Sequence, residues 1–278
     1  MSAAAARAEA SIYDPKVALE FFKAAGKPEK VADGKTIFAE KEKGFFSRSK
    51  VYLLLSGEVG LLAGKKPIGS VKAGEIFGEL AAITQSPRSA TAVAKSACLM
   101  IALDDKAFQS GLRKKPAFAL MLMSMLVRRL RETIRTLEAS GGLAPEAAAK
   151  ESAAFDPKHL AELVKGLSDE PLAYFNSGSP IMRAGQAGVR MYVVAEGSVT
   201  VKIGEQVVER LGPGGVFGEA ALVDQSTRLA TAVADTDCAL LPISRNAFLA
   251  LVKMSPGFAE SMLSSLARRL RFLTSRAK

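Results

Sequence analysis

One stretch of this chain occurs twice, and this internal repeat constrains the fold more than any other feature. FGELAAITQSPRSATAVA spans residues 77–94, and FGEAALVDQSTRLATAVA spans residues 217–234. The copies begin at residues 77 and 217, an offset of 140, and the same offset relates RRLR at 128–131 to RRLR at 268–271. A repeat at a fixed offset predicts one structural unit built twice. The length of 278 residues suits two ordinary domains.

The sequence between the copies indicates where one unit ends and the next begins. It contains GGLAP, and a glycine pair followed by proline is typical of a helix end and a short linker. We therefore expect a first domain over 12–140, a linker over 141–154 and a second domain over 155–278.

The local patterns of both copies predict the same elements. Asp14 and Asp156 each precede a proline, which is typical of an N-cap followed by proline at the first helical position. The segments KTIFAE, VYLLLSG, EVGLLAG and PIGSVKAG are short, apolar and separated by glycine, which predicts antiparallel strands. Apolar residues then recur every three or four positions along 117–138, which predicts a helix with one apolar stripe. We predict an α+β fold of two tandem β-rolls (jelly-roll-like), each with flanking helices and a closing C-terminal helix.

The composition argues against several classes of protein. A single histidine, His159, argues against histidine metal sites and a Ser-His-Asp triad, so we expect neither catalysis nor a metal site. Cys98 and Cys238 occupy equivalent repeat positions in separate domains, which predicts buried free thiols. The longest apolar run, residues 118–127, is too short to span a membrane, and the N-terminus lacks the apolar segment of a secretory signal. We therefore expect a cytoplasmic protein.

The repeated stretch carries the residues best suited to chemistry. Gly78 before Glu79 predicts a tight turn that opens a short helix, and the first amides of a helix can bind an anion. Arg88 follows Glu79 by nine residues and offers a planar fork that matches two phosphate oxygens. Since a carboxylate repels phosphate, Glu79 is better explained as the acceptor for a sugar hydroxyl. Together these groups indicate a site for a compact ribose phosphate.

The pattern F-G-E-x-A followed by R-x-A-T, present in both copies, resembles the phosphate-binding cassette of cyclic nucleotide-binding domains. Bacterial cAMP receptor proteins, cyclic-nucleotide-gated channels and regulatory subunits of cAMP-dependent protein kinase share this domain. The resemblance covers about residues 30–138 and 174–273. It implies that the two glutamates bind the ribose 2′-hydroxyl, that the two arginines bind the cyclic phosphate, and that nearby amides complete each site. The implied first site is Gly78, Glu79, Leu80, Arg88, Ser89 and Ala90, and the second is Gly218, Glu219, Ala220, Arg228 and Ala230.

The two copies differ beside the arginine, which bears on the ligand. Ser89 supplies a hydroxyl that can contact the phosphate or a guanine, whereas its counterpart Leu229 supplies none. The family pattern favours cAMP at both sites, and Ser89 leaves cGMP open at the first. We expect a residue of the closing helix to cap the purine. The candidates are Arg131, Thr133 and Arg135 in the first copy, and Arg271 and Phe272 in the second.

These observations predict a non-catalytic cyclic nucleotide sensor with two binding sites. We expect it to relay occupancy through movement of the closing helices, either to a protein partner in trans or within a homodimer formed through helix 117–138. One alternative is a Crp/Fnr-like transcription regulator, although no recognisable helix-turn-helix follows either closing helix, so we do not expect specific DNA as a partner. The other alternative is a protein in which one of the two sites is degenerate and does not bind.

Overall fold

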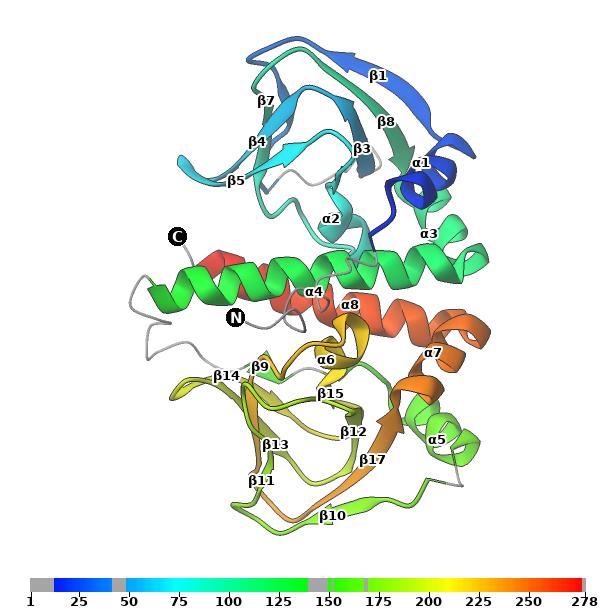
Figure 1. Ribbon diagram of the computed structural model, residues 1–278, viewed down its shortest axis with the longest axis vertical. Coiled ribbons are helices and arrows are strands. Elements are labelled where there is room, and N and C mark those ends of the chain that lie inside the picture. Colours follow the sequence, from blue (N-terminus) through cyan, green and yellow to red (C-terminus); the bar gives the residue numbers. More distant parts are fainter. Residues whose placement is uncertain (1–12, 42–48, 140–149, 152, 168–169, 277–278) are drawn as a thin grey trace, which may run out of the picture. The chain divides into compact units, whose positions relative to one another are not determined.

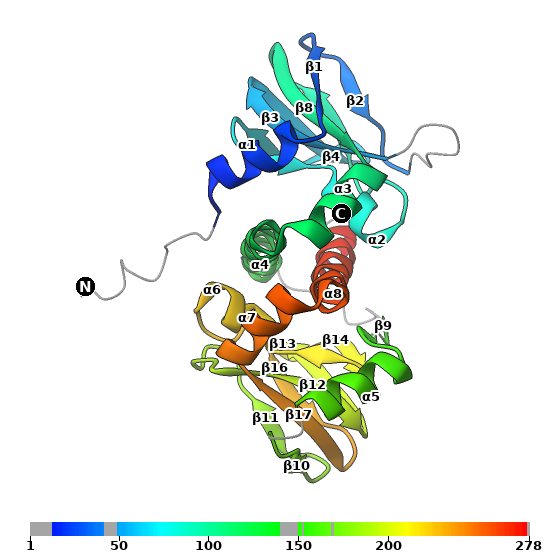
Figure 2. The same ribbon diagram turned by 90° about the vertical axis from the view of Figure 1, so that its right-hand side faces the viewer.

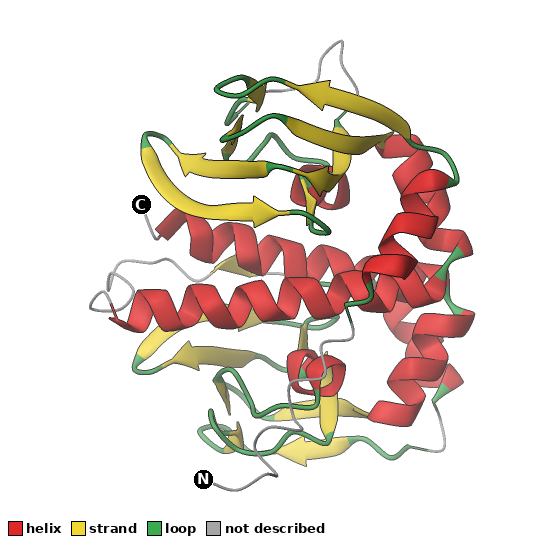
Figure 3. Ribbon diagram, turned by 45° about the horizontal axis from the view of Figure 1, so that its top comes forward, coloured by secondary structure: helices red, strands yellow, loops and turns green. Residues whose placement is uncertain are grey.

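Both copies of the repeat form a β-roll with helices in the computed structural model, which describes residues 13–41, 49–139, 150–151, 153–167 and 170–276. The strands and helices of each copy are distinguished in Figure 3, and they confirm the predicted fold class. The first copy contains α1 (Pro15–Lys23), β1 (Lys27–Val31), β2 (Thr36–Phe38), β3 (Lys50–Ser56), β4 (Glu58–Ala63), β5 (Lys66–Lys72), β6 (Ile76–Phe77), α2 (Glu79–Thr84), β7 (Thr91–Ala94), β8 (Cys98–Asp104), α3 (Asp105–Lys114) and α4 (Pro116–Ala139). The second contains β9 (Lys150–Glu151), α5 (Pro157–Gly166), β10 (Ala173–Phe175), β11 (Pro180–Met182), β12 (Arg190–Glu196), β13 (Val199–Ile203), β14 (Gln206–Leu211), β15 (Val216–Phe217), α6 (Glu219–Asp224), β16 (Thr231–Ala234), β17 (Cys238–Ser244), α7 (Arg245–Met254) and α8 (Pro256–Arg276). Most of the expected linker, residues 141–149 and 152, lies outside the described residues.

Two sheets make each roll, and their strand orders correspond between the copies. The first copy has the orders β1-β8-β3-β6 and β2-β7-β4-β5, and the second has β10-β17-β12-β15 and β11-β16-β13-β14-β9. The pairs within each roll are antiparallel, and β9 adds a parallel pair to β14. In Figures 1 and 2, β8 runs between β1 and β3, with α1 beside it.

The capping predictions at the helix starts are confirmed. The Asp14 carboxylate accepts a hydrogen bond of 2.8 Å from the Lys16 amide at the start of α1. Asp156 accepts one of 2.9 Å from the His159 amide at the start of α5. Each bond satisfies an amide that has no partner within its helix.

Aromatic packing in the core of each roll places the repeated stretch. Tyr52 on β3 stacks on Phe77 on β6 with ring centroids 5.0 Å apart, and Tyr192 stacks on Phe217 at 5.4 Å. Tyr52, Phe77 and Phe217 belong to the buried cluster of their roll, and Tyr192 is partly buried and packs against its cluster. Phe77 and Phe217 are buried in the core, so the glycine and the glutamate that follow each of them lie next to it. Cys98 and Cys238 are buried free thiols of the same clusters, as predicted.

The closing helices are divided between two compact units. One unit contains Tyr13–Leu122 with Ala267–Lys278, and the other contains Met123–Leu266. The first therefore combines the β-roll of copy one with the end of α8. The second combines the β-roll of copy two with most of α4.

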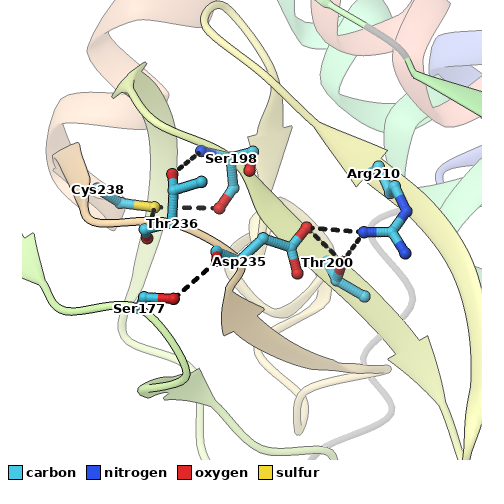
Figure 4. Close-up of polar contacts among 7 residues, drawn as sticks. All are labelled: Ser177, Ser198, Thr200, Arg210, Asp235, Thr236 and Cys238. Atoms are coloured by element: carbon cyan, nitrogen blue, oxygen red, sulfur yellow. Dashed lines mark hydrogen bonds and ion pairs between the residues drawn. The ribbon is translucent and has the colours of Figure 1, made fainter.

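A polar network distinguishes the second roll from the first (Figure 4). The Thr200 hydroxyl on β13 donates to the Asp235 carboxylate at 2.6 Å, and Arg210 on β14 donates to the same carboxylate at 3.0 Å. The positions equivalent to Thr200 and Asp235 are Gly60 and Lys95, and a Cβ on Gly60 would lie 2.6 Å from the Lys95 Cε. In the first copy the Lys95 stem thus lies over Gly60 and its amine pairs with Glu58 at 3.8 Å, whereas in the second copy Asp235 at this position pairs with Arg210.

Candidate functional site

Each cassette begins with a glycine in the left-handed region. Gly78 has a φ of 78° and Gly218 a φ of 84°, and the short helices α2 and α6 start at the next residue. A Cβ on Gly78 would lie 2.9 Å from Nη1 of Arg88, and one on Gly218 would lie 2.5 Å from Nη1 of Arg228. Only glycine satisfies both the dihedral angle and this close approach. The predicted tight turn is therefore present in both copies.

The arginine of each cassette folds back onto that glycine. Nη1 of Arg88 donates to the Gly78 carbonyl at 2.8 Å, and Nη1 of Arg228 donates to the Gly218 carbonyl at 2.9 Å. Both arginines are only 7% exposed. The nine-residue segment between glycine and arginine, which contains the short helix, is thus closed by the guanidinium itself. The geometry brings the predicted glycine, glutamate and arginine of each site together.

The glutamates are buried beside these arginines. Glu79 is 1% exposed and Glu219 is 3% exposed, which is exceptional for a carboxylate. Burial lowers the pKa of Arg228, and the charges of Tyr192 and Glu219 act in the opposite direction. Buried carboxylates and guanidinium groups at one turn form a preorganised set of acceptors and donors, suited to a ligand with both hydroxyl and anionic groups.

The main chain around each arginine is fixed by equivalent hydrogen bonds. The Lys41 amide donates to the Arg88 carbonyl at 2.9 Å, and the Gly185 amide donates to the Arg228 carbonyl at 3.0 Å. The threonine of the motif adds a second link, because the Thr91 hydroxyl accepts from the Glu40 amide at 2.9 Å. The Ala-Thr pair after the arginine therefore ties the cassette to the segment after β2.

Two groups at the first site were not predicted from the sequence. Nη2 of Arg88 donates to the Lys50 carbonyl at 2.8 Å, and its Cζ lies 4.1 Å from the ring centroid of Phe38. Every residue has the same backbone carbonyl, so the sequence could not show that the Lys50 carbonyl accepts from Arg88. Phe38 carries a weak signal as an aromatic residue at the end of a predicted strand.

The remaining predicted residues occupy different environments. Ala90, Ala220 and Ala230 are buried, whereas Leu80, Ser89 and Leu229 are partly exposed. Within the described part of the chain, no group of three or more histidine, cysteine, aspartate or glutamate side chains is arranged to hold a metal ion. None of the described helices combines the length and the hydropathy that crossing a bilayer requires.

The closing-helix arginines correct one expectation. We expected the residue that caps the purine to come from the closing helix of the same copy, with Arg131 among the candidates for the first site and Arg271 among those for the second. In the structure, Arg131 donates to Asp224 and Thr227 of the second cassette. Arg271 donates to the Pro87 carbonyl of the first cassette. The repeat gave no sign of this exchange, because both helices have the same local sequence.

Comparison with known proteins agrees with this geometry. The family model for the cyclic nucleotide-binding domain matches residues 28–115 and 172–255. The chain is 40% identical over 113 residues to the cyclic AMP receptor protein of Thermus thermophilus, covering 37% of this chain and 52% of that protein. It is 26% identical over 228 residues to a cAMP-dependent protein kinase regulatory subunit of Mucor circinelloides, covering 81% of this chain and 47% of that protein. It thus spans about half the length of these relatives.

Among solved structures, the regulatory domain of Toxoplasma gondii PKA with cAMP is 24% identical, with a TM-score of 0.32. The match covers 86% of this chain and 85% of that one. The family model alone matches more than half of this chain, once in each copy of the repeat. The chain therefore belongs to the cyclic nucleotide-binding domain family, and it carries that domain twice.

Proposed function

We propose that the chain is a non-catalytic sensor that binds cAMP at two sites. Arg88 and Arg228 hold the cyclic phosphate, and Glu79 and Glu219 accept a hydrogen bond from the ribose 2′-hydroxyl. One observation carries the proposal: in both cassettes, a buried glutamate and a buried arginine converge on a left-handed glycine. The relatives named as cAMP receptor protein and cAMP-dependent protein kinase regulatory subunit support the choice of cAMP.

The remaining binding groups in this proposal come from the main chain and from Ser89. Amides at the start of α2 and α6, and those of the residues after each arginine, complete the phosphate site. Ser89 is partly exposed, and its counterpart Leu229 carries no hydroxyl. It makes cGMP the alternative ligand at the first site.

Occupancy is relayed, we propose, through α4 and α8 to a protein partner in trans. A ligand that binds one arrangement of a closing helix better than another shifts the population toward that arrangement. We favour a partner in trans over a homodimer through helix 117–138. Phe118, Met121 and Leu122 on that helix are already buried within the chain, so they offer little apolar surface to a second copy.

Titration calorimetry tests this function. The wild type is titrated with cAMP, cGMP and 5′-AMP, together with Arg88→Leu, Arg228→Leu and the double variant. We expect two sites in the wild type, one in each single variant and none in the double. Arg113→Leu is the matched control, because this arginine is exposed on α3, and it should bind like the wild type. Absence of heat from every cyclic nucleotide in the wild type would contradict the proposal.

A further inference from the structure

Each closing helix supplies an arginine to the cassette of the other copy. Arg131 on α4 donates to the Thr227 carbonyl at 2.9 Å, and Arg271 on α8 donates to the Pro87 carbonyl at 2.8 Å. Both carbonyls belong to the residue directly before the phosphate arginine of that cassette. Each contact lies inside one compact unit, because Arg131 and Thr227 share one unit and Arg271 and Pro87 share the other.

The two crossed contacts are unequal. Nε of Arg131 donates to Oδ2 of Asp224 at 2.5 Å, and Nη2 donates to Oδ1 at 3.0 Å. The side chains are only 14% and 20% exposed. Such a two-pronged, charge-assisted pair is stronger than a bond between neutral groups. At the equivalent position of the first cassette stands Thr84, whose hydroxyl donates within its own helix to the Leu80 carbonyl at 2.6 Å.

Asp224 connects Arg131 to a further residue of the segment before Arg228. The Asp224 carboxylate also accepts a hydrogen bond of 3.1 Å from the Ser226 amide. Arg131 is thus bonded to both ends of the four-residue segment from Asp224 to Thr227, and Ser226 between them is fixed through Asp224. The next residue is the predicted phosphate ligand, so the position of its backbone depends on this segment.

We propose that Arg131 is a positioning residue for the second site, supplied by the closing helix of the first copy. This inference rests on the proposed function, since it concerns cyclic nucleotide binding at that site. At the other end of the same helix, Phe118 stacks on Phe21 of α1 with ring centroids 3.5 Å apart. A displacement of α4 therefore alters the second cassette, and by linkage binding at the second site alters α4. The first site depends less on α8, because Arg271 reaches only a carbonyl there.

The test measures each site by itself. Arg88→Leu leaves the second site, Arg228→Leu leaves the first, and Arg131→Met is added to each background. We expect Arg131→Met to weaken cAMP binding at the second site about tenfold and at the first site less than about twofold. Asp224→Asn, which keeps the side-chain size, should weaken the second site similarly. Combining it with Arg131→Met should add little, because both remove the same pair.

Arg128→Met is the matched control on α4. Arg128 lies one turn before Arg131, and its exposed side chain is 4.0 Å from Glu132 of its own helix. An exposed pair of this kind contributes little, so neither site should change. Equal losses at both sites after Arg131→Met, or no loss at the second, would overturn the proposal.

Hydrogen exchange separates this inference from the proposed function. In the absence of nucleotide, Arg131→Met should raise amide exchange over residues 222–229 and leave residues 82–89 unchanged. This result supports the positioning role even if the wild type binds no cyclic nucleotide, in which case only the proposed function fails. Unchanged exchange over 222–229 contradicts the positioning role, whatever the calorimetry shows.

Discussion

The Arg88 guanidinium lies over the ring of Phe38, whereas the equivalent Arg228 has no aromatic partner from the corresponding strand. Phe38 pairs with Ala92 in the first roll, and Met182 pairs with Ala232 in the second, so Met182 occupies the position of Phe38. A cation over an aromatic face is attracted by the ring, and the attraction is larger where water is excluded. The two cassettes therefore share the contact between guanidinium and glycine carbonyl, and they differ in the aromatic ring beside the guanidinium.

Phe38→Met should make the first site resemble the second. Loss of the ring leaves Arg88 less well oriented, and we expect cAMP affinity at the first site to fall about threefold to tenfold. The measurement is calorimetry in the Arg228→Leu background. Phe22→Met, which alters a buried phenylalanine of α1, should lower stability without changing affinity. Unchanged affinity in Phe38→Met would show that the carbonyl contacts alone orient the guanidinium.

Gly78→Ala should abolish binding at the first site, and Gly74→Ala should not. Both glycines have a left-handed φ, 78° and 89°, so alanine costs each about 1–2 kcal/mol of strain. Only at Gly78 would the new Cβ also meet Nη1 of Arg88, at 2.9 Å, while nothing lies within 4 Å at Gly74. Urea denaturation should show a loss of stability in both variants, with the larger loss in Gly78→Ala because of the added close contacts. Calorimetry in the Arg228→Leu background should show lost affinity in Gly78→Ala alone. Similar affinities in the two variants would contradict this reasoning.

Glu79→Gln should reduce discrimination at the ribose, because the neutral amide oxygen accepts a weaker hydrogen bond than the carboxylate. If the buried carboxylate accepts from the 2′-hydroxyl, the wild-type first site prefers cAMP over 2′-deoxy-cAMP by about tenfold or more. The amide keeps the shape but loses the charge, so we expect the ratio of the two affinities to fall toward one. Glu75→Gln is the control, because its carboxylate accepts from the Lys72 amide and lies outside the cassette. A ratio that stays at the wild-type value in Glu79→Gln would assign the glutamate a structural role.

Features that depend on short stretches of sequence could be predicted. The strands β2 to β5, the N-caps at Asp14 and Asp156, and the turn at Gly78 all follow from residues within a few positions of one another. The strand β1 was missed because its sequence KPEKV has no apolar alternation. It forms through backbone pairing with β8, which the residue types do not encode.

Features that depend on long-range packing could not be predicted. Arg131 and Arg271 occupy identical RRLR sequences, so nothing local indicates which cassette each will contact. The hydrogen bond from Arg88 to the Lys50 carbonyl could not be predicted for a different reason, since every residue has the same backbone oxygen. The repeat pointed to the candidate site residues, whereas the groups that orient their side chains could be found only in the structure.

Thr84→Asp should create in the first cassette the ion pair that the second already has. Thr84 is equivalent to Asp224, and Arg271, whose pKa is lowered by burial, already donates to the nearby Pro87 carbonyl. We expect the new carboxylate to stabilise the chain by about 1 kcal/mol relative to the same change made with Arg271→Met. In that second background the aspartate lies at a helix C-terminus without a cation, where it is unfavourable.

Urea denaturation of the four proteins gives the coupling as a double-mutant cycle. A coupling of zero would mean that Arg271 cannot reach position 84. The residue at that position would then not explain why Arg131 forms an ion pair with the second cassette and Arg271 forms none with the first.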